Sequence, residues 1–383
     1  MTSNLPPVLV LGDHFGYAGG VAHGVTTYWL NVLPALRRRG VEVTACFLRE
    51  PHPAADALRD HGIEAIFFSA AKWNPLVAFR LARLIRAKGC RVLHAAGIKA
   101  SLFARLAARG VGAQTIIHVH DFVIPSPLVK AGHRLAARPS DLAICVSRPV
   151  QPVAVHGYHV DPARVRVNHS GIRVERFVVR DSGVRSMVRQ RENIAEEALV
   201  IAMVARMYPV KGHKTMLRIM AKIAQACPRA LLMLVGDGPE RAASEALTDS
   251  LGIRNHVRFL GQRGDVPELL AAADVGVMSS ESEGLPLAGL ELLAAGCPLV
   301  TFDVGGMGDI VTDGVNGRLI APGDIGAFAE AVVSLLQDPV LRKACAERAR
   351  DTANAFSLDA HVERLIRCYE ESALTGAVRL APG

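Results

Sequence analysis

Apolar runs of strand length alternate with helical patterns along almost the whole chain, and this alternation limits the fold more than any other feature. Such apolar runs are typical of strands that are buried on both faces of a parallel sheet. We therefore predict an α/β fold in which helices cover both faces of doubly wound sheets. In the first half the predicted strands are Val8–Leu11, Val41–Leu48, Ile63–Phe68, Val92–His94, Thr115–Val119, Leu142–Val146 and Val165–Val167. In the second half they are Leu199–Ala205, Ala230–Val235, His256–Leu260, Asp274–Met278, Pro298–Phe302 and Gly317–Ile320.

The two series of strands indicate two domains, because 383 residues are too many for one ordinary core. A charged stretch from Val178 to Glu197 separates the series and is interpreted as a linker followed by a first helix. We expect an N-terminal domain over residues 1–180 and a C-terminal domain over residues 181–356. A last helix, over residues 357–375, is expected to pack back on the N-terminal domain.

Charge is distributed unevenly between the halves. Residues 1–180 hold 23 Lys and Arg against 10 Asp and Glu, whereas residues 181–383 hold 21 against 26. A basic first half suits an anionic partner such as an acidic lipid surface, a nucleic acid or a phosphorylated substrate. Nucleic acid is the weakest of these, because aromatic residues make up only 5% of the chain and no stacking platform is evident.

Cysteine spacing and hydropathy point to the cytoplasm. The seven cysteines are scattered without a CxxC or Cys/His cluster, which argues for reduced thiols rather than disulfides or zinc. No apolar run approaches the roughly 20 residues that a membrane span needs. The N-terminus also lacks the pattern of a signal peptide.

Polar and glycine residues follow the predicted strands at one end. A doubly wound sheet binds ligands beyond the carboxyl ends of its strands. Arg206 and Gly236 follow two strands of the second half, and Glu283 follows a third. In the first half a loop with Gly19 and Gly20 follows the first strand, and His120 follows another. If the two edges face each other, they form a cleft between the domains.

Two carboxylates, Glu283 and Glu291, lie eight residues apart across a predicted loop-to-helix junction. Pro286 suits the first turn of that helix, whose free N–H groups would form a natural anion site. This arrangement suits a polyhydroxyl ligand that carries phosphate. The plainer alternative is one acid supporting the helix dipole and one surface glutamate.

Other candidate residues are basic or histidine side chains. Arg206 and Lys211 leave one strand end together and suit a diphosphate, although basic residues in loops are often only solvated. His118 and His120 should point to the same face of their strand. They do not indicate a metal site, because no third ligand follows at a convincing spacing. Gly19 and Gly20 would allow a phosphate to approach the backbone, or they mark only a turn.

The stretch from Trp73 to Lys88 predicts a basic amphipathic helix. Such a helix ordinarily packs on a sheet with its charged face in water. Contact with an anionic membrane surface is the alternative, and the basic first half favours it.

Taken together, these motifs resemble the retaining GT-B glycosyltransferases of group 1, also called family GT4. The resemblance covers nearly the whole chain. It depends most on the E-x7-E motif and on the segments Arg206 with Lys211-Gly212, Val235-Gly236-Asp237-Gly238-Pro239-Glu240, Gly305-Gly306, Asp309-Ile310-Val311 and Asp313-Gly314-Val315-Asn316-Gly317.

The resemblance implies two Rossmann-like domains that face each other across a cleft. It also implies transfer of a sugar from a nucleotide donor, most simply a UDP- or GDP-sugar, with retention of configuration. The acceptor would be a glycolipid, a polysaccharide or a small molecule. Front-face substitution of this kind needs neither a protein nucleophile nor a metal, and the nucleotide-sugar is a co-substrate rather than a cofactor.

The site residues follow by analogy with the family. Arg206 and Lys211 would hold the diphosphate, Glu283 the sugar hydroxyls and Glu291 the ribose. His120 would approach the sugar from the first domain. The base of the donor would lie near Arg263. The donor would also be held by Gly19, Gly20, Gly236 and the segment Gly284, Leu285, Pro286 and Leu287.

This chain departs from the family pattern in two places. The family often has Asn-Gly-Val-Asp where Ser170-Gly171-Ile172-Arg173 stands, and commonly Glu at the position of Asp309. Neither change removes a predicted donor ligand. The competing functions are a nucleotide-sugar epimerase or phosphorylase of the same architecture and an inactive nucleotide-sugar-binding scaffold.

Overall fold

The computed structural model describes residues 5–16, 24–69, 73–178 and 182–378 and divides the chain into two compact units. The first unit holds Met1–Gly171 and Leu358–Gly383, and the second holds Ile172–Ser357. The chain therefore leaves the first unit earlier than the expected boundary at residue 180. It returns to that unit through its last helix, α12 (Leu358–Val378), which continues past the expected residue 375.

The first unit is built on a seven-stranded parallel sheet with the order β3-β2-β1-β4-β5-β6-β7. All seven predicted strands are present, with ends that differ by a few residues. They are β1 (Val8–Gly12), β2 (Val43–Phe47), β3 (Ala65–Phe67), β4 (Val92–Ala96), β5 (Gln114–Val119), β6 (Leu142–Cys145) and β7 (Val165–Val167).

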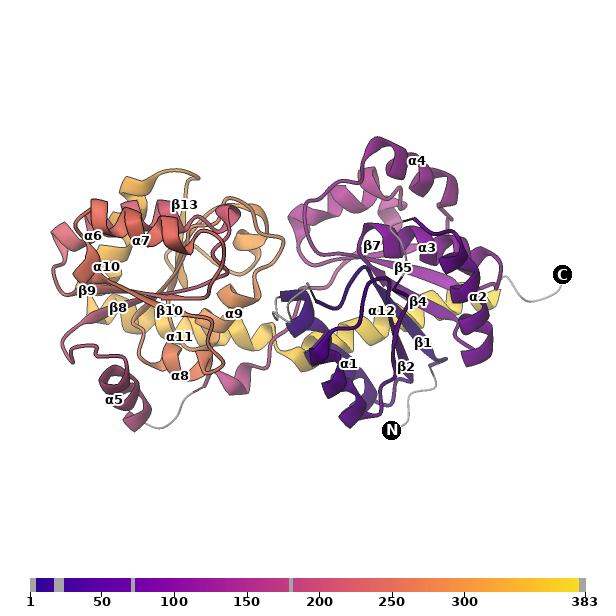
Figure 1. Cartoon of the computed structure of the whole chain (residues 1–383), viewed down its shortest axis with the longest axis horizontal. Helices are drawn as coiled ribbons and strands as arrows, with labels where there is room; N and C mark the ends of the chain where they lie inside the picture. Colours follow the sequence, from indigo (N-terminus) through magenta and orange to yellow (C-terminus); the bar gives the residue numbers. More distant parts are fainter. Residues whose placement is uncertain (1–4, 17–23, 70–72, 179–181, 379–383) are drawn as a thin grey trace. The chain divides into compact units, whose positions relative to one another are not determined.

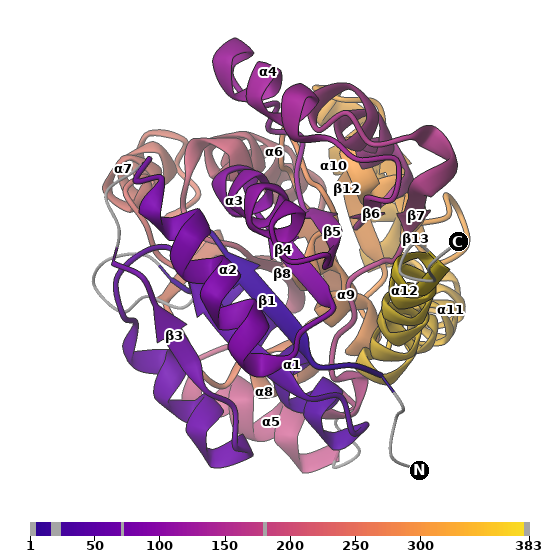
Figure 2. The same cartoon turned by 90° about the vertical axis from the view of Figure 1, so that its right-hand side faces the viewer.

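Helices cover both faces of this sheet, as Figures 1 and 2 show. One face packs against α1 and α12, and the other against α2 and α3. Successive side chains of a strand point to opposite faces of the sheet. Val8 and Val10 therefore face the first pair of helices, whereas Leu9 and Leu11 face the second. The helices are α1 (Gly24–Arg38), α2 (Leu76–Lys88), α3 (Ile98–Arg109) and α4 (Pro127–Ala136).

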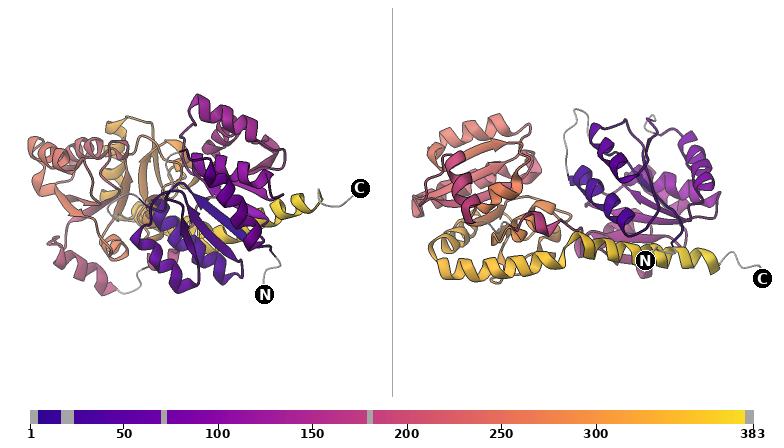
Figure 3. Two further views of the ribbon diagram at one scale, coloured as in Figure 1. Left: turned by 45° about the vertical axis from the view of Figure 1, so that its right-hand side comes forward. Right: turned by 90° about the horizontal axis from the view of Figure 1, so that it is seen from below.

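The C-terminal helix completes the core of the first unit. Figure 3 shows α12 along one side of that unit. Its apolar residues Leu358, Val362 and Leu365 are buried in the same cluster as Val10 and Trp29. The first unit therefore needs a segment that follows the whole second unit in the sequence.

The second unit contains a six-stranded parallel sheet with the order β10-β9-β8-β11-β12-β13. The sequence predicted each strand: β8 (Leu199–Val204), β9 (Ala230–Val235), β10 (Val257–Gly261), β11 (Val275–Met278), β12 (Leu299–Phe302) and β13 (Gly317–Ile320). Its helices are α5 (Ser182–Arg191), α6 (His213–Ala226), α7 (Arg241–Ser250), α8 (Val266–Ala271), α9 (Leu287–Ala294), α10 (Ile325–Gln337) and α11 (Pro339–Ala355).

Both sheets reverse their strand order beside the first strand of the unit, between β1 and β4 and between β8 and β11. A crevice opens at such a reversal beyond the carboxyl ends of the strands, and ligands bind there in doubly wound folds. In the part of the chain that the structure describes, no helix is both long enough and apolar enough to cross a membrane.

Candidate functional site

Three loops meet at the carboxyl edge of the second sheet. The loop after β8 accepts two hydrogen bonds from the loop after β11: Ser279 Oγ donates to the Gly212 carbonyl at 2.9 Å, and Glu281 N–H donates to the Val210 carbonyl at 2.9 Å. The loop after β12 joins them, because Gly306 N–H donates to the Glu283 carbonyl at 2.9 Å. Backbone contacts therefore hold these loops together at the strand-order reversal.

Gly212 is required at this junction. Its φ is +71°, a left-handed conformation that favours glycine. A Cβ atom there would also collide with the Ser279 carbonyl. The glycine thus lets the two loops approach closely enough for side chains on both to meet.

Lys211 and Glu283 form an ion pair across these loops. Lys211 Nζ lies 2.6 Å from Glu283 Oε1, and the Glu283 side chain is only 7% exposed. Lys211 is more accessible, at 22%. The sequence placed both residues at this edge of the sheet, but it did not predict that they bind each other.

Arg206 supplies a second cation at the same edge. Its guanidinium carbon lies 4.7 Å from the centre of the Tyr208 ring. Among residues 5–16, 24–69, 73–178 and 182–378, no carboxylate forms an ion pair with Arg206. Its charge is therefore available to an anion.

The second carboxylate of the motif lies inside α9, and the first precedes the helix, as the sequence predicted. Pro286, however, is not in the first turn: it is the N-cap residue in an extended conformation, and α9 begins at Leu287. The position of this proline was therefore predicted wrongly by one residue. Gly284 and Leu285 lie in the preceding loop, where Leu285 is 9% exposed.

Glu291 is partly buried, and desolvation raises its pKa to about 7, against a smaller opposing effect from the charge of Arg176. No hydrogen bond or ion pair to its carboxylate occurs within the described residues. At neutral pH this group is divided between its charged and neutral forms. A ligand that donates hydrogen bonds to it would favour the charged form.

Gly236 follows β9 and lies against the loop after β8. Its φ is +140°, and a Cβ atom there would meet the Ala205 carbonyl. Close packing between loops therefore explains this glycine without a ligand. The predicted donor role of Gly236 remains a prediction.

Arg263, which was expected near the base of the donor, is committed to other side chains. Its guanidinium makes two hydrogen bonds of 2.8 Å to Asp265 and one of 2.9 Å to Glu192. These partners raise the pKa of Arg263, and the hydrogen bonds from Arg263 lower the pKa of Asp265 to about 2. The structure thus assigns Arg263 a surface ion-pair network and leaves its contact with a nucleotide base as a prediction.

In the first unit, His120 directly follows β5. Its ring stacks on that of His118, with centroids 3.9 Å apart, so the expectation that the two rings share a face is confirmed. Desolvation lowers the pKa of His120 to about 4. The predicted Gly19 and Gly20 lie outside the described residues.

Sequence reasoning missed Asp13, which follows β1 at the carboxyl edge of the first sheet. Its Oδ1 accepts a hydrogen bond of 2.6 Å from Ala100 N–H, in the first turn of α3. Burial raises the pKa of Asp13, although the backbone N–H groups of Ala100 and Lys99 oppose the shift. The sequence signal that could have revealed Asp13 was its position directly after the first strand, together with the start of a helix near Gly97.

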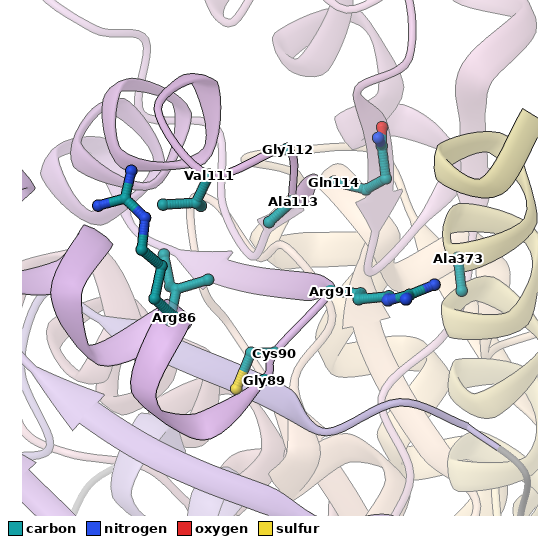
Figure 4. A pocket seen from close by; sticks show the side chains of 10 residues that line it. Arg86, Gly89, Cys90, Arg91, Val111, Gly112, Ala113, Gln114 and Ala373 are labelled. Carbon is teal, nitrogen blue, oxygen red and sulfur yellow. The ribbon is translucent and has the colours of Figure 1, made fainter. Parts of the chain in front are cut away.

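A cavity of about 270 Å³ lies at the opposite edge of the first sheet (Figure 4). Its lining includes Arg91 and Gln114, at the amino ends of β4 and β5, and Ala373 of α12. It contains none of the predicted site residues. Within the described ranges, no group of three His, Cys, Asp or Glu side chains is arranged to hold a metal ion.

Models of two known protein families match this chain. The model of the "Glycosyl transferases group 1" family matches residues 184–352, and that of "Glycosyltransferase Family 4" matches residues 22–176. The two matches together take in most of both units. The chain belongs to the group 1 glycosyltransferases.

Relatives of this group 1 chain carry several activities in their names. A D-inositol 3-phosphate glycosyltransferase of Salinispora arenicola (strain CNS-205) is 34% identical over 229 residues, which are 56% of this chain and 51% of the relative. The chain thus spans about half the length of that relative. An Escherichia coli UDP-Gal:alpha-D-GlcNAc-diphosphoundecaprenol alpha-1,3-galactosyltransferase is 25% identical over 308 residues, 76% of this chain and 77% of the relative.

Solved structures confirm the fold of this group 1 member. The Anabaena protein Alr3699/HepE in complex with UDP has a TM-score of 0.81 at 22% identity, over 95% of this chain and 99% of its own. A glycosyltransferase from Rickettsia africae has a TM-score of 0.86 at 18% identity, over 97% and 99%. The expected GT-B fold of two Rossmann-like domains is therefore confirmed.

Proposed function

We propose that the chain moves a sugar from a nucleotide-sugar donor to an acceptor with retention of anomeric configuration. The observation that carries this proposal is the Lys211–Glu283 pair at the strand-order reversal of the second sheet, together with Arg206 at the same edge, which has no ion-pair partner among the described residues. A cation next to a buried acid suits a ligand that presents phosphate oxygens and hydroxyl groups side by side. Nucleotide-sugars have this chemistry.

The donor would be held by the four predicted side chains of the second unit. Arg206 and Lys211 bind the diphosphate, Glu283 accepts hydrogen bonds from sugar hydroxyls, and Glu291 accepts those of the ribose. The backbone N–H groups of Gly284, Leu285 and Leu287 would face the phosphate and sugar. A UDP-sugar is the first choice, since the structural relative from Anabaena is described in complex with UDP and with UDP-glucose; a GDP-sugar is the second.

The transfer would proceed by front-face substitution. The bond between the anomeric carbon and the phosphate oxygen breaks, and the acceptor oxygen attacks from the same face. The acceptor's proton passes to the departing phosphate oxygen, so the nucleoside diphosphate leaves with it. Arg206 and Lys211 stabilise the charge that grows on that phosphate. The scheme requires neither a protein nucleophile nor a metal ion, and His120 would contact the sugar from the first domain.

The acceptor would be a glycolipid, a polysaccharide or a small molecule, and we propose peripheral contact with an anionic membrane from the cytoplasmic side. In α2, Leu76 and Phe79 are 61% and 62% exposed beside Arg80 and Arg83. Exposed apolar side chains bordered by basic ones suit an anionic bilayer surface. Substituting Phe79→Glu should weaken pelleting with phosphatidylglycerol vesicles; pelleting equal to wild type counts against this contact.

A panel of UDP-, GDP- and ADP-sugars tests the function. We expect one donor to bind and to be hydrolysed slowly without an acceptor, and faster with the correct one. Product analysis separates the competing activities: a new glycosidic bond indicates transfer, an isomerised donor indicates an epimerase, and a sugar phosphate indicates a phosphorylase. Tight donor binding with no product would indicate an inactive scaffold. If no donor binds, the proposal is wrong.

A further inference from the structure

The ring of His120 is held by other rings rather than by hydrogen bonds. It stacks on His118, with ring centroids 3.9 Å apart and an interplanar angle of 30°, and it makes a T-shaped contact with Tyr28, with centroids 5.1 Å apart at 77°. Across the described ranges, neither ring nitrogen of His120 has a hydrogen-bond partner in the protein. The direction in which these nitrogens point therefore depends on how His118 and Tyr28 are fixed.

His118 is fixed from inside the sheet. It is 1% exposed, and its Nδ1 lies 2.9 Å from Nε2 of the fully buried His94 on the neighbouring strand β4. The Tyr28 hydroxyl lies 3.5 Å from the same Nδ1. The other side of His94 is closed by the Tyr369 hydroxyl of α12, at 2.7 Å.

Tyr28 is fixed by α12. Its hydroxyl lies 3.1 Å from Nε2 of His361, which is fully buried. Nδ1 of His361 faces two oxygens, the His169 carbonyl at 2.8 Å and Asn168 Oδ1 at 3.2 Å. Because these oxygens can only accept, Nδ1 carries the proton of the neutral ring and Nε2 accepts from Tyr28. The hydrogen bonds thus give Tyr28 one preferred direction.

These rings are neutral. Burial lowers the pKa of His94 and of His361 to about 3, and that of His118 well below its ordinary value. Apolar side chains would fill the same space without the desolvation cost of so many polar groups. The buried His118 Nε2 has no hydrogen-bond partner among the described residues. A network that is costly for stability is expected where the fold serves a site.

We propose that Tyr28 and His361 are positioning residues that orient the imidazole of His120, with His361 acting through the Tyr28 hydroxyl. This inference rests on the proposed function, in which His120 contacts the donor sugar. It adds a chain of contacts from the C-terminal helix, through α1, to the end of β5. Among the described residues His361 and His120 share no ring contact, and the ring of Tyr28 contacts both of them.

The test combines Tyr28→Phe, His361→Gln and the double variant. We expect each single variant to lower kcat at least tenfold while the donor Kd, for which the second unit supplies most of the proposed contacts, stays within twofold. The double variant should lose no more than the larger single loss, because both changes break one chain. Leu36→Val, a buried apolar change two turns further along α1, controls for lost packing and should leave kcat within twofold.

Histidine ring NMR provides a readout that does not need activity. The His120 signals are assigned by their loss in His120→Gln, and we expect them to shift or broaden in His361→Gln but not in Leu36→Val. Unchanged His120 signals, or kcat losses that add in the double variant, overturn the positioning role. If wild-type protein uses no donor while the His120 signals still respond to His361→Gln, the proposed function fails and the positioning inference survives.

Discussion

Two acids of the second unit differ sharply in their surroundings although they belong to one sequence motif. Glu283 is buried against a lysine at 2.6 Å, whereas Glu291 has no partner among the described residues and its pKa rises to about 7. The first acid is held in an ion pair across two loops. The second exchanges its proton near neutrality, so the two should respond differently to substitution and to pH.

Substituting Lys211→Ala or Glu283→Ala should lower turnover at least tenfold, equivalent to more than about 1.4 kcal/mol. Each change removes a proposed donor contact and leaves the other charge unpaired. The matched control is Lys214→Ala, which breaks the ion pair of Lys214 with Glu240 at 2.7 Å in the same unit. Steady-state kinetics with the identified donor measure the effect. Wild-type turnover in both site variants would contradict the site assignment.

Loss of the Glu291 proton should strengthen donor binding and lower the stability of the folded protein. Ribose hydroxyls would donate stronger hydrogen bonds to the charged carboxylate than to the neutral acid, so the wild-type donor Kd should fall as pH rises through about 7. Folding favours the protonated form, because the folded pKa lies above the ordinary 4.5. The folded state thus binds more protons, and this stability is lost as pH rises from about 4.5 to 7.

Glu291→Gln should therefore bind donor weakly at every pH. It should also be more stable than wild type at pH 8, by on the order of 2 kcal/mol, with the difference vanishing below about pH 4.5. Urea unfolding and donor titration at several pH values measure both effects. A stability difference that does not depend on pH would refute the assignment of the titration to Glu291.

At the scale of elements, a buried ion pair attaches α4 and the segment near Tyr158 to α3. Arg105 of α3 bonds Asp141 at 2.8 Å, and neither side chain is exposed. The same guanidinium donates to the carbonyls of His133 at 3.1 Å and Tyr158 at 2.6 Å. One side chain therefore joins segments that are far apart in the sequence.

Substituting Asp141→Ala should destabilise the first unit by about 3–5 kcal/mol, because it leaves the Arg105 charge buried and without its carboxylate. Asp56→Ala, which breaks an exposed ion pair with Arg59 in the same unit, is the control and should change little. Urea unfolding followed by tryptophan fluorescence suits this measurement, since Trp29 is buried in the first unit. Equal stability of the two variants would contradict the structural role of the pair.

At the scale of the whole molecule, the two units differ in continuity. The second unit is one uninterrupted segment, Ile172–Ser357, whereas the first is assembled from Met1–Gly171 and Leu358–Gly383. The core of the first unit includes Val362, Leu365 and Tyr369 of α12. The contact of His361 with the His169 carbonyl ties together the segments by which the chain leaves and re-enters this unit.

Residues 172–357 expressed alone should therefore fold and unfold cooperatively. Residues 1–171 alone should not, because they lack the apolar face of α12, and adding a peptide of residues 358–383 should restore a folded state. Circular dichroism and calorimetry distinguish the cases. Cooperative unfolding of residues 1–171 without the peptide would mean that α12 is dispensable for this core.

The strands, their order along the chain and the placing of the two motif acids could be predicted from sequence, because they follow from local patterns. Apolar runs such as Ala230–Val235 are bounded by glycine or charged residues, and Glu283 and Glu291 flank a helix start that Pro286 and the following apolar run mark. The exact helix start, at Leu287 rather than Pro286, depends on backbone angles that the pattern does not resolve.

The tertiary structure alone decided which side chains meet. Lys211 and Glu283 are far apart in the sequence, as are Tyr28 and His361. Arg263 pairs with Asp265 and with the distant Glu192. The physical reason is that periodicity reports only which face of an element is buried. A contact between distant residues depends on loop closure and on the desolvation of both partners, and these are set when the sheets assemble.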